Sequence, residues 1–453
     1  MNGSVRPALR LAVAAAAYRF RESLFLLPAL IVVGSIVLAE VAAAVDRDAG
    51  PVPFTVTMHS STATWLLSTV AGATITTAGV VFSLTVVSLQ LASSQFSPRV
   101  MRSFIRDRLS QVVIGSLIAT FVYCVLILRG IDGEAGSVAP RVSLTIAIAL
   151  TVVTVLLIVA HLDHLAHGLQ VGEVVRSIGG EGEQVLAAEA AVSRTEQRAA
   201  TRYPPVGVPV LTVAAPRDGW VTQAPGDRVL AAVEPGATVC LETRTGAYIH
   251  AGEPLATVWP VPPSPERTRR RLIRTVLIAD SRTMQNDIDF ALRQLVDIGL
   301  RALSAAINDP TTAVEVVLRI GSLLRRLLTT DLPAEGVSGA EGRLLLRPWR
   351  LSPQEYVAHG FDQLRQAAPA QPQVAAALFR VLNMLMVHVR QSGREDVVPA
   401  LRRQIDLLLD ALRSTPGLHD ADLERLATIA TGTADPADHS KLSDETASRP
   451  AHQ

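Results

Sequence analysis

The chain contains one long stretch, residues 49–98, without a single Asp, Glu, Lys or Arg. An α-helix crosses the hydrocarbon core of a bilayer with about 20 apolar residues, so part of this stretch is expected to span a membrane. Three further apolar runs have the required length. The four expected spans cover about 23–45, 62–92, 110–128 and 141–161.

The second expected span carries a polar seam. Hydroxyl, amide and glycine residues recur in it at seven-residue spacings: Thr69, Gly72, Thr76, Gly79, Ser83, Gln90 and Ser97. Seven-residue spacing keeps one helix face against a neighbour, and in lipid small and hydroxyl residues permit close helix approach. We interpret this span as a central helix that packs the bundle or lines a pore. A single helix over residues 62–97 would be about 54 Å long, so it either projects from the membrane or breaks near Gly72 or Gly79.

The arginines that flank the spans are distributed unevenly. Residues 1–22 and 99–108 hold four arginines each, whereas the other two connecting segments hold three between them. The positive-inside rule therefore places both termini in the cytoplasm. The net charge of the whole chain is only +1, so composition offers no electrostatic argument for a nucleic-acid partner.

The sequence changes character after the fourth span. Residues 168–204 read as a helical connector. Residues 205–262 hold short β-prone runs separated by Pro and Gly, which predict a small all-β, barrel-like domain. Residues 264–431 predict an α-helical cytoplasmic domain, with a loop at 331–346 and helices at 266–307, 310–330, 353–368, 371–391, 394–414 and 419–430. The polar tail, residues 432–453, is expected to be disordered.

The expected fold is therefore a mixed membrane protein with a four-helix transmembrane bundle, a small β domain and an α-helical cytoplasmic domain. Lys441, in the tail, is the only lysine. The folded part cannot use a phosphate-loop lysine, a Schiff base, or lysine-tethered biotin or lipoate. Cys124 and Cys240 suggest neither a disulfide framework nor a metal cluster. We expect no cofactor and no bound metal.

Several polar residues in and near the expected spans are candidate sites. His161, His164 and His167 follow the fourth span, but three-residue steps turn helical side chains away from one another, which disfavours one metal ion. Glu40 is an acid inside the first span, where an ion-pathway role competes with a position near the headgroups.

A second group of polar residues forms a candidate cytoplasmic interaction site: Asp287, Asp297, Arg301, Asn308 and Asp309. Structural roles compete with that interpretation. Asp309 before Pro310 is ordinary helix-start chemistry, and Asp297 and Arg301 have the spacing of an ion pair on one helix face. The chain contains no GxSxG, HExxH or glycine-rich phosphate loop, so we do not expect an enzyme.

Two stretches are similar to a known family. They are AGVVFSLTVVSLQLASSQFSPRV and QNDIDFALRQLVDIGLRALSAAINDPTTA, with a weaker third, HLDHLAHGLQV. The chain resembles in them the domain-of-unknown-function 2254 family of bacterial membrane proteins. That resemblance implies a multi-pass protein of the bacterial plasma membrane and supplies no activity. The run GAYIHAGEPLATV is also similar to half of a biotinyl/lipoyl-type barrel, but without the modified lysine.

Two functions remain open. The chain could be a homo-oligomeric channel in the lipid bilayer that passes ions or small solutes along the second span. It could instead be a non-conducting membrane-anchored scaffold or sensor whose cytoplasmic domain recruits partners. The long, charge-free, hydroxyl-rich second span favours the channel, although such residues also pack helices.

The expected topology can be tested by cysteine labelling in intact cells. A cysteine at position 135 should react with an impermeant thiol reagent, because the loop between the third and fourth spans is expected outside. A cysteine at position 300 should react only after the membrane is opened. Labelling of position 300 in intact cells would refute the cytoplasmic assignment of the C-terminal half.

Overall fold

The computed structural model describes residues 25–48, 53, 55–95, 108–131, 139–168, 170–204 and 207–432. It divides into two compact units, residues 1–173 and residues 174–453, which we call unit 1 and unit 2. Ser97, the arginines of residues 1–24 and 99–107, and the tail from residue 433 lie outside the described residues. The predictions that rest on them stay predictions.

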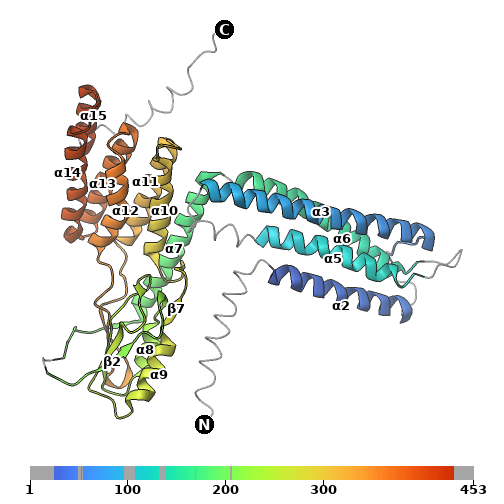
Figure 1. Cartoon of the computed structure of the whole chain (residues 1–453), viewed down its shortest axis with the longest axis horizontal. Coiled ribbons are helices and arrows are strands. Elements are labelled where there is room, and N and C mark those ends of the chain that lie inside the picture. The colour runs from blue at the N-terminus through green and yellow to red at the C-terminus, as the bar shows by residue number, and fades with distance from the viewer. Residues whose placement is uncertain are drawn as a thin grey trace, which may run out of the picture. The chain divides into compact units, whose positions relative to one another are not determined.

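Unit 1 contains four long apolar helices that run side by side (Figure 1). They are α2 (Leu26–Asp48), α3 (Ser60–Gln95), α5 (Arg108–Leu128) and α6 (Arg141–Gly168). Each is long and apolar enough to cross a membrane. Among the described residues one more helix meets the same criterion, α13 (Pro372–Gln391) of unit 2. The described part of the chain thus has five candidate spans, and the count of four stays a prediction.

The helix α5 occupies the centre of unit 1. Half of the residues in the apolar stretch of α5 are buried, compared with 22% in α3 and in α6. Gly115 explains the close packing against α2, since a Cβ atom there would lie 2.9 Å from atoms of Pro28 and Ile31. The hydroxyls of Thr120 on α5 and Thr154 on α6 lie 2.9 Å apart. Within one chain, therefore, the central helix is α5 and not the second span.

The second span forms one continuous helix. The 36 residues of α3 pass through Gly72 and Gly79 without interruption, which gives a length of about 54 Å at 1.5 Å per residue. The expected alternative of a break at either glycine is wrong. A glycine lowers helix propensity by only about 1 kcal/mol, which the strongly apolar flanks offset.

One acid connects two helices of unit 1. Asp46, near the end of α2, accepts hydrogen bonds from the backbone N–H groups of Val142 and Ser143, both at 2.8 Å, and from Ser143 Oγ at 2.7 Å. These N–H groups belong to the first turn of α6 and have no partner within that helix. The Asp46 carboxylate therefore caps α6. Its negative charge also interacts favourably with the positive N-terminal end of the α6 dipole. Tyr123 of α5 donates to Ser143 O at 3.1 Å and joins the third helix to this point.

The strands all lie in unit 2 and form two open sheets. The larger sheet has the order β1-β8-β9-β4-β6-β2, and the smaller has the order β5-β3-β7. The strands are β1 (Gln197–Arg198), β2 (Leu211–Ala214), β3 (Gly219–Gln223), β4 (Thr238–Leu241), β5 (Tyr248–Ile249), β6 (Pro254–Trp259), β7 (Leu277–Ala279), β8 (Gly336–Ser338) and β9 (Leu344–Leu346). Neither sheet closes, so the described strands form no barrel, and the barrel-like prediction is not confirmed.

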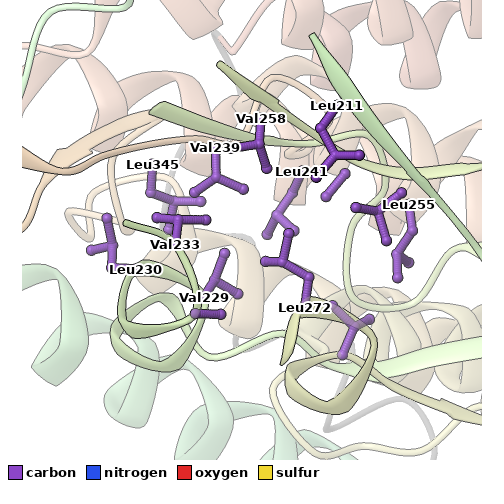
Figure 2. Packing of buried hydrophobic residues seen from close by; sticks show 14 of the residues in the cluster. Leu211, Val229, Leu230, Val233, Val239, Leu241, Leu255, Val258, Leu272 and Leu345 are labelled. Atoms are coloured by element: carbon purple, nitrogen blue, oxygen red, sulfur yellow. The ribbon is translucent and has the colours of Figure 1, made fainter. Parts of the chain in front are cut away.

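The sheets share a hydrophobic core with two helices, α8 (Gly226–Ala232) and α9 (Pro265–Thr275). Figure 2 shows Val239, Val258 and Leu345 from the large sheet beside Val229 of α8 and Leu272 of α9. The sequence predicted no helix in residues 205–262. Pro225 explains the start of α8, because a proline fits immediately before or within a first helical turn.

The remaining helices of unit 2 are α7 (Val171–Thr195), α10 (Ile288–Ala302), α11 (Pro310–Leu327), α12 (Pro353–Ala367), α13, α14 (Val398–Arg413) and α15 (Asp420–Ala430). Figure 1 shows α10 to α15 side by side. Short 3₁₀ turns at Ala340–Gly342 and Glu395–Val397 complete the described elements.

Two sequence-based boundaries in unit 2 are wrong. The single helix expected over 266–307 is split into α9, β7 and α10, because Val276 and Ile278 alternate inward as a strand and Asn286 adopts a left-handed φ of 55°. The loop expected over 331–346 contains β8 and β9. Leu345 and Leu346 of β9 are buried because β9 pairs in parallel with β4, a partner far away in the sequence.

Removal of the Asp46 cap should destabilise unit 1. Asp46→Ala leaves two N–H groups of α6 without their acceptor, and a lost cap costs about 0.5–2 kcal/mol. We expect a lower thermal unfolding midpoint for the full chain in detergent. Glu40→Ala is the matched control, because Glu40 is an exposed acid on the same helix. Equal midpoints for the two variants would contradict the capping role.

Candidate functional site

The polar seam of α3 lies on the face turned away from the rest of unit 1. Leu67, Thr74 and Val81 are buried against the other helices. The seam residues Thr69, Thr76 and Ser83 follow them by two positions, which is a rotation of about 200°. The exposed set comprises Thr69, Gly72, Thr76, Gly79, Ser83 and Gln90. Within one chain, then, the seam does not pack the bundle.

Two seam hydroxyls are satisfied within α3 itself. Thr69 Oγ1 donates to Trp65 O and Thr76 Oγ1 donates to Gly72 O, both at 2.8 Å. Such bonds let a hydroxyl face lipid, water or another helix without an unpaired donor. The face is therefore compatible with a second copy of the chain or with a water-filled path.

Unit 2 contains a cavity of about 820 Å³. Its wall is built from α7, the turn before α8, the end of β4, the start of α10, the segment from Pro333 to Leu351, and Tyr356 of α12. Sites for small organic molecules usually measure about 300–1,000 Å³ and combine an apolar lining with a few placed polar groups. The cavity has that size, and its lining combines apolar residues with a larger share of charged and polar ones.

One wall is fixed by a bidentate ion pair. Arg347 Nη1 and Nη2 donate to the two carboxylate oxygens of Glu196, at 2.9 and 2.7 Å. The side chains are only 10% and 11% exposed. Arg347 Nε also donates to Ala334 O at 3.1 Å. This fork geometry orders the end of α7 against the segment that follows β9.

A second ion pair of the wall has its acid on α7 itself. Arg350 Nη2 donates to Glu189 Oε2 at 3.3 Å. Burial raises the pKa of Glu189, and the attraction of Arg350 only partly offsets that effect. Burial also raises the pKa of the neighbouring Tyr356 phenol, and the charge of Glu189 raises it further. Tyr356 therefore stays a neutral donor beside a carboxyl group that protonates more readily than usual.

Charged side chains at the start of α10 are joined by hydrogen bonds and ion pairs. Arg282 donates to Asp287 at 2.6 and 2.9 Å and to Asp289 Oδ2 at 2.7 Å. His359 Nδ1 lies 2.6 Å from Asp289 Oδ1. Burial alone would raise the pKa of Asp289, but the hydrogen bonds from His359 and Arg282 outweigh it and hold the pKa well below its usual range. Gly246 packs so closely here that any Cβ would collide with the Asp287 carboxylate.

One cation of the cavity wall has no acidic partner. Arg244 lies just beyond β4, is half-buried, and donates Nη1 to the carbonyl of Thr245 at 3.2 Å. No ion pair joins it to a carboxylate in the described part of the chain, whereas Arg347 and Arg350 each have one. A guanidinium in this state suits a carboxylate or phosphate group of a ligand.

The structure does not gather the predicted cytoplasmic site in one place. Asp287 caps the start of α10 by accepting from Phe290 N, and Asp309 caps α11 by accepting from Thr312 N at 3.0 Å. The 15 residues of α10 separate them by about 22 Å. Asn308 accepts from Gln371 at 2.9 Å and Asp297 and Arg301 are half-buried on α10. Only Asp287 lines the cavity.

The histidines after the fourth span also diverge. His161 is buried in α6, whereas His164 is exposed, and the side chain of His167 lies outside the described residues. No group of three or more His, Cys, Asp or Glu residues with a metal-binding arrangement occurs within the described ranges. Glu40 is exposed on α2.

The sequence does not mark the residues that line the cavity, because their partners are far away along the chain. Glu196 pairs with a residue 151 positions away and Glu189 with one 161 positions away. No local pattern marks such pairs, since each acid alone reads as the polar face of a surface helix. The only sequence signal is the seven-residue spacing of Glu189 and Glu196, which would share a face of a helix that ran through both. In the structure α7 ends at Thr195, one residue before Glu196.

Comparison with known proteins gives a family without an activity. A family model described as a predicted membrane protein (DUF2254) matches residues 21–384. An uncharacterized protein of Mycobacterium bovis is 34% identical over 356 residues, which cover 76% of this chain and 67% of that protein. An uncharacterized protein of Mycobacterium tuberculosis is 33% identical over 355 residues, with the same coverage. No solved structure matches the chain. The chain belongs to the DUF2254 family of predicted membrane proteins.

Proposed function

We propose that this protein is a membrane-anchored sensor whose unit 2 binds a small organic molecule with an acidic group. The observation that carries the proposal is the cavity of about 820 Å³ in unit 2. Its buried charges are already paired, so the wall keeps its shape without a ligand. Arg244 is the cation left for the ligand's acidic group. The proposal includes no catalytic step.

The helix α7 supports a signalling role for this cavity. Glu189 on α7 and Glu196, the residue that follows its last turn, form two of the wall's ion pairs. The same helix begins at Val171, and only two residues separate it from the end of α6 at Gly168. A ligand that changes the packing against α7 therefore acts on the element that follows the last helix of unit 1. With the orientation expected from the flanking arginines, the cavity would face the cytoplasm.

The cavity can be tested by filling it. Ala188 lines the cavity from α7, and Ala188→Trp should occupy it with an indole ring. Native mass spectrometry of full-length protein should show an acidic small molecule retained from the cell or added in a metabolite extract. The variant should lose that molecule, because its binding volume is gone.

Ala187→Trp is the matched control, because Ala187 is the adjacent exposed residue of α7 and does not line the cavity. It should retain the ligand at the level of the unmodified protein. Absence of any bound molecule in the unmodified protein, or equal retention by the two variants, would contradict the sensor proposal.

An oligomeric pore is the second proposal, and the outward polar face of α3 favours it. The helix carries no formal charge from Ser60 to Gln95, and its seam is left uncovered within one chain. If several copies place this face around an axis, Ser83 and Gln90 would line the path for an ion or small solute. Self-association through the same small residues without a path is the scaffold version of this arrangement.

The pore version predicts thiol accessibility along the seam. Cysteines at Ser83 and Gln90 should react with water-soluble reagents in proteoliposomes and alter conductance. A cysteine at Leu84 should not, because that residue is exposed on the flank of α3 and would contact lipid. The native Cys124 and Cys240 are buried, so the background is low.

Ser83→Leu completes the test of the pore. The exposed Ser83 has space around it within one chain, so the leucine should not overpack the bundle. It should abolish conductance while insertion and assembly persist. Unreactive cysteines at both seam positions, with no conductance in the unmodified protein, would exclude the pore.

A further inference from the structure

The helix α9 presents a face of four arginines. Arg267, Arg270, Arg271 and Arg274 are all exposed on this 11-residue helix. Their spacing of three, four and seven residues places them on one side of an α-helix. The whole chain has a net charge of +1, so this face is a local concentration of charge and not a sample of the average surface.

The opposite face of α9 holds the helix in place. Thr268 and Leu272 are fully buried, and Leu272 belongs to the hydrophobic core beneath the sheets (Figure 2). Ile273 also packs against that core. The arginines are therefore presented by a fixed element of the fold.

The charge of this face is not balanced within unit 2. None of the four arginines forms an ion pair with a carboxylate among the residues that the structure describes. Glu266, the only acid of α9, lies 3.5 Å from Arg269, which is on another side of the helix. Arg267 with Arg271, and Arg270 with Arg274, are like-charged pairs at i,i+4, which destabilise a helix. An anionic surface against this face would remove that repulsion.

We propose that the exposed arginine face of α9 binds the anionic lipid headgroups of the membrane that holds unit 1. Unit 1 keeps unit 2 permanently near a bilayer, so the face needs no high intrinsic affinity to be occupied. Guanidinium groups match phosphate oxygens in a two-pronged geometry. The alternative of RNA is disfavoured, because α9 has no aromatic residue on which a base could stack. This proposal is independent of the cavity.

The test uses energy transfer in nanodiscs. The full chain with Ser264→Cys carries a fluorophore next to α9, since Ser264 is exposed and both native cysteines are buried. The discs contain an acceptor-labelled lipid in either pure phosphatidylcholine or phosphatidylcholine with phosphatidylglycerol. Transfer should be stronger in the anionic discs and should fall toward the neutral value as salt is raised.

Charge-removal variants identify the face. Each arginine is expected to contribute about fivefold to the occupancy ratio. The variant R267Q/R270Q/R271Q/R274Q should therefore give the same transfer in both discs. The matched control, R380Q/R390Q/R402Q/R403Q, removes four exposed arginines of α13 and α14 and should keep the full dependence on anionic lipid.

Three outcomes would overturn the proposal. One is equal transfer of the unmodified protein in neutral and anionic discs. Another is a lipid dependence that survives in the α9 variant or disappears equally in the control. The third is tight binding of a labelled single-stranded RNA by the unmodified protein in neutral discs, together with loss of this binding in the α9 variant. That result would assign the face to nucleic acid instead.

Discussion

The cavity of unit 2 depends on the ion pair between Glu196 and Arg347. It joins the end of α7 to the segment after β9, and Arg347 also holds Ala334 O in the same wall. Removal of one partner would leave a buried charge uncompensated, which costs about 3–5 kcal/mol. Gly226 lies against the same pair, because a Cβ atom there would be in ordinary contact with Glu196 at 3.4 Å and with Arg347 at 3.5 Å. The cavity wall and the end of α7 thus share one electrostatic anchor.

The two units satisfy their buried polar groups in different ways. In unit 1 the partners are mostly backbone groups, as with Asp46 at the start of α6 and with the back-bonded threonines of α3. In unit 2 the partners are guanidinium groups, as with Arg282 against Asp287 and Asp289. A helix in lipid has few side-chain partners, so backbone groups act as the hydrogen-bond partners of its polar side chains. A folded unit outside the spans can bring distant side chains together.

The parts of the structure that were predictable from sequence are those with a local signal. Apolar length located α2, α3, α5 and α6, and the Asp-Pro pair marked the start of α11. The β8–β9 pair was not predictable, since its strands have three residues each and gain their stability from β4. The position of α5 at the centre was hidden for a related reason. A glycine such as Gly115 reveals close packing only when the neighbouring helix is known.

The same reasoning limits what could be foreseen of the site. The seam of α3 was visible as a repeat, but the repeat alone did not say which way it faces. The answer came from residues two positions earlier, Leu67, Thr74 and Val81, whose burial fixes the helix rotation. The sequence carried no signal of the cavity beyond the seven-residue spacing of Glu189 and Glu196. Only Asp287 was shared between the predicted interaction residues and the cavity wall.

The pairing of β9 with β4 has a consequence for biosynthesis. The partners Thr238 and Leu344 are about 100 residues apart, and β9 separates β4 from the β8–β1 edge of the sheet. A ribosome therefore completes all of unit 1 and most of the sheet before the strand that joins its two halves emerges. Until then the edge of β4 that pairs with β9 has no strand partner, while its other edge can already pair with β6. Contacts of such high sequence separation form slowly, so the joining of the two halves of the sheet is expected to be a late step in the folding of unit 2.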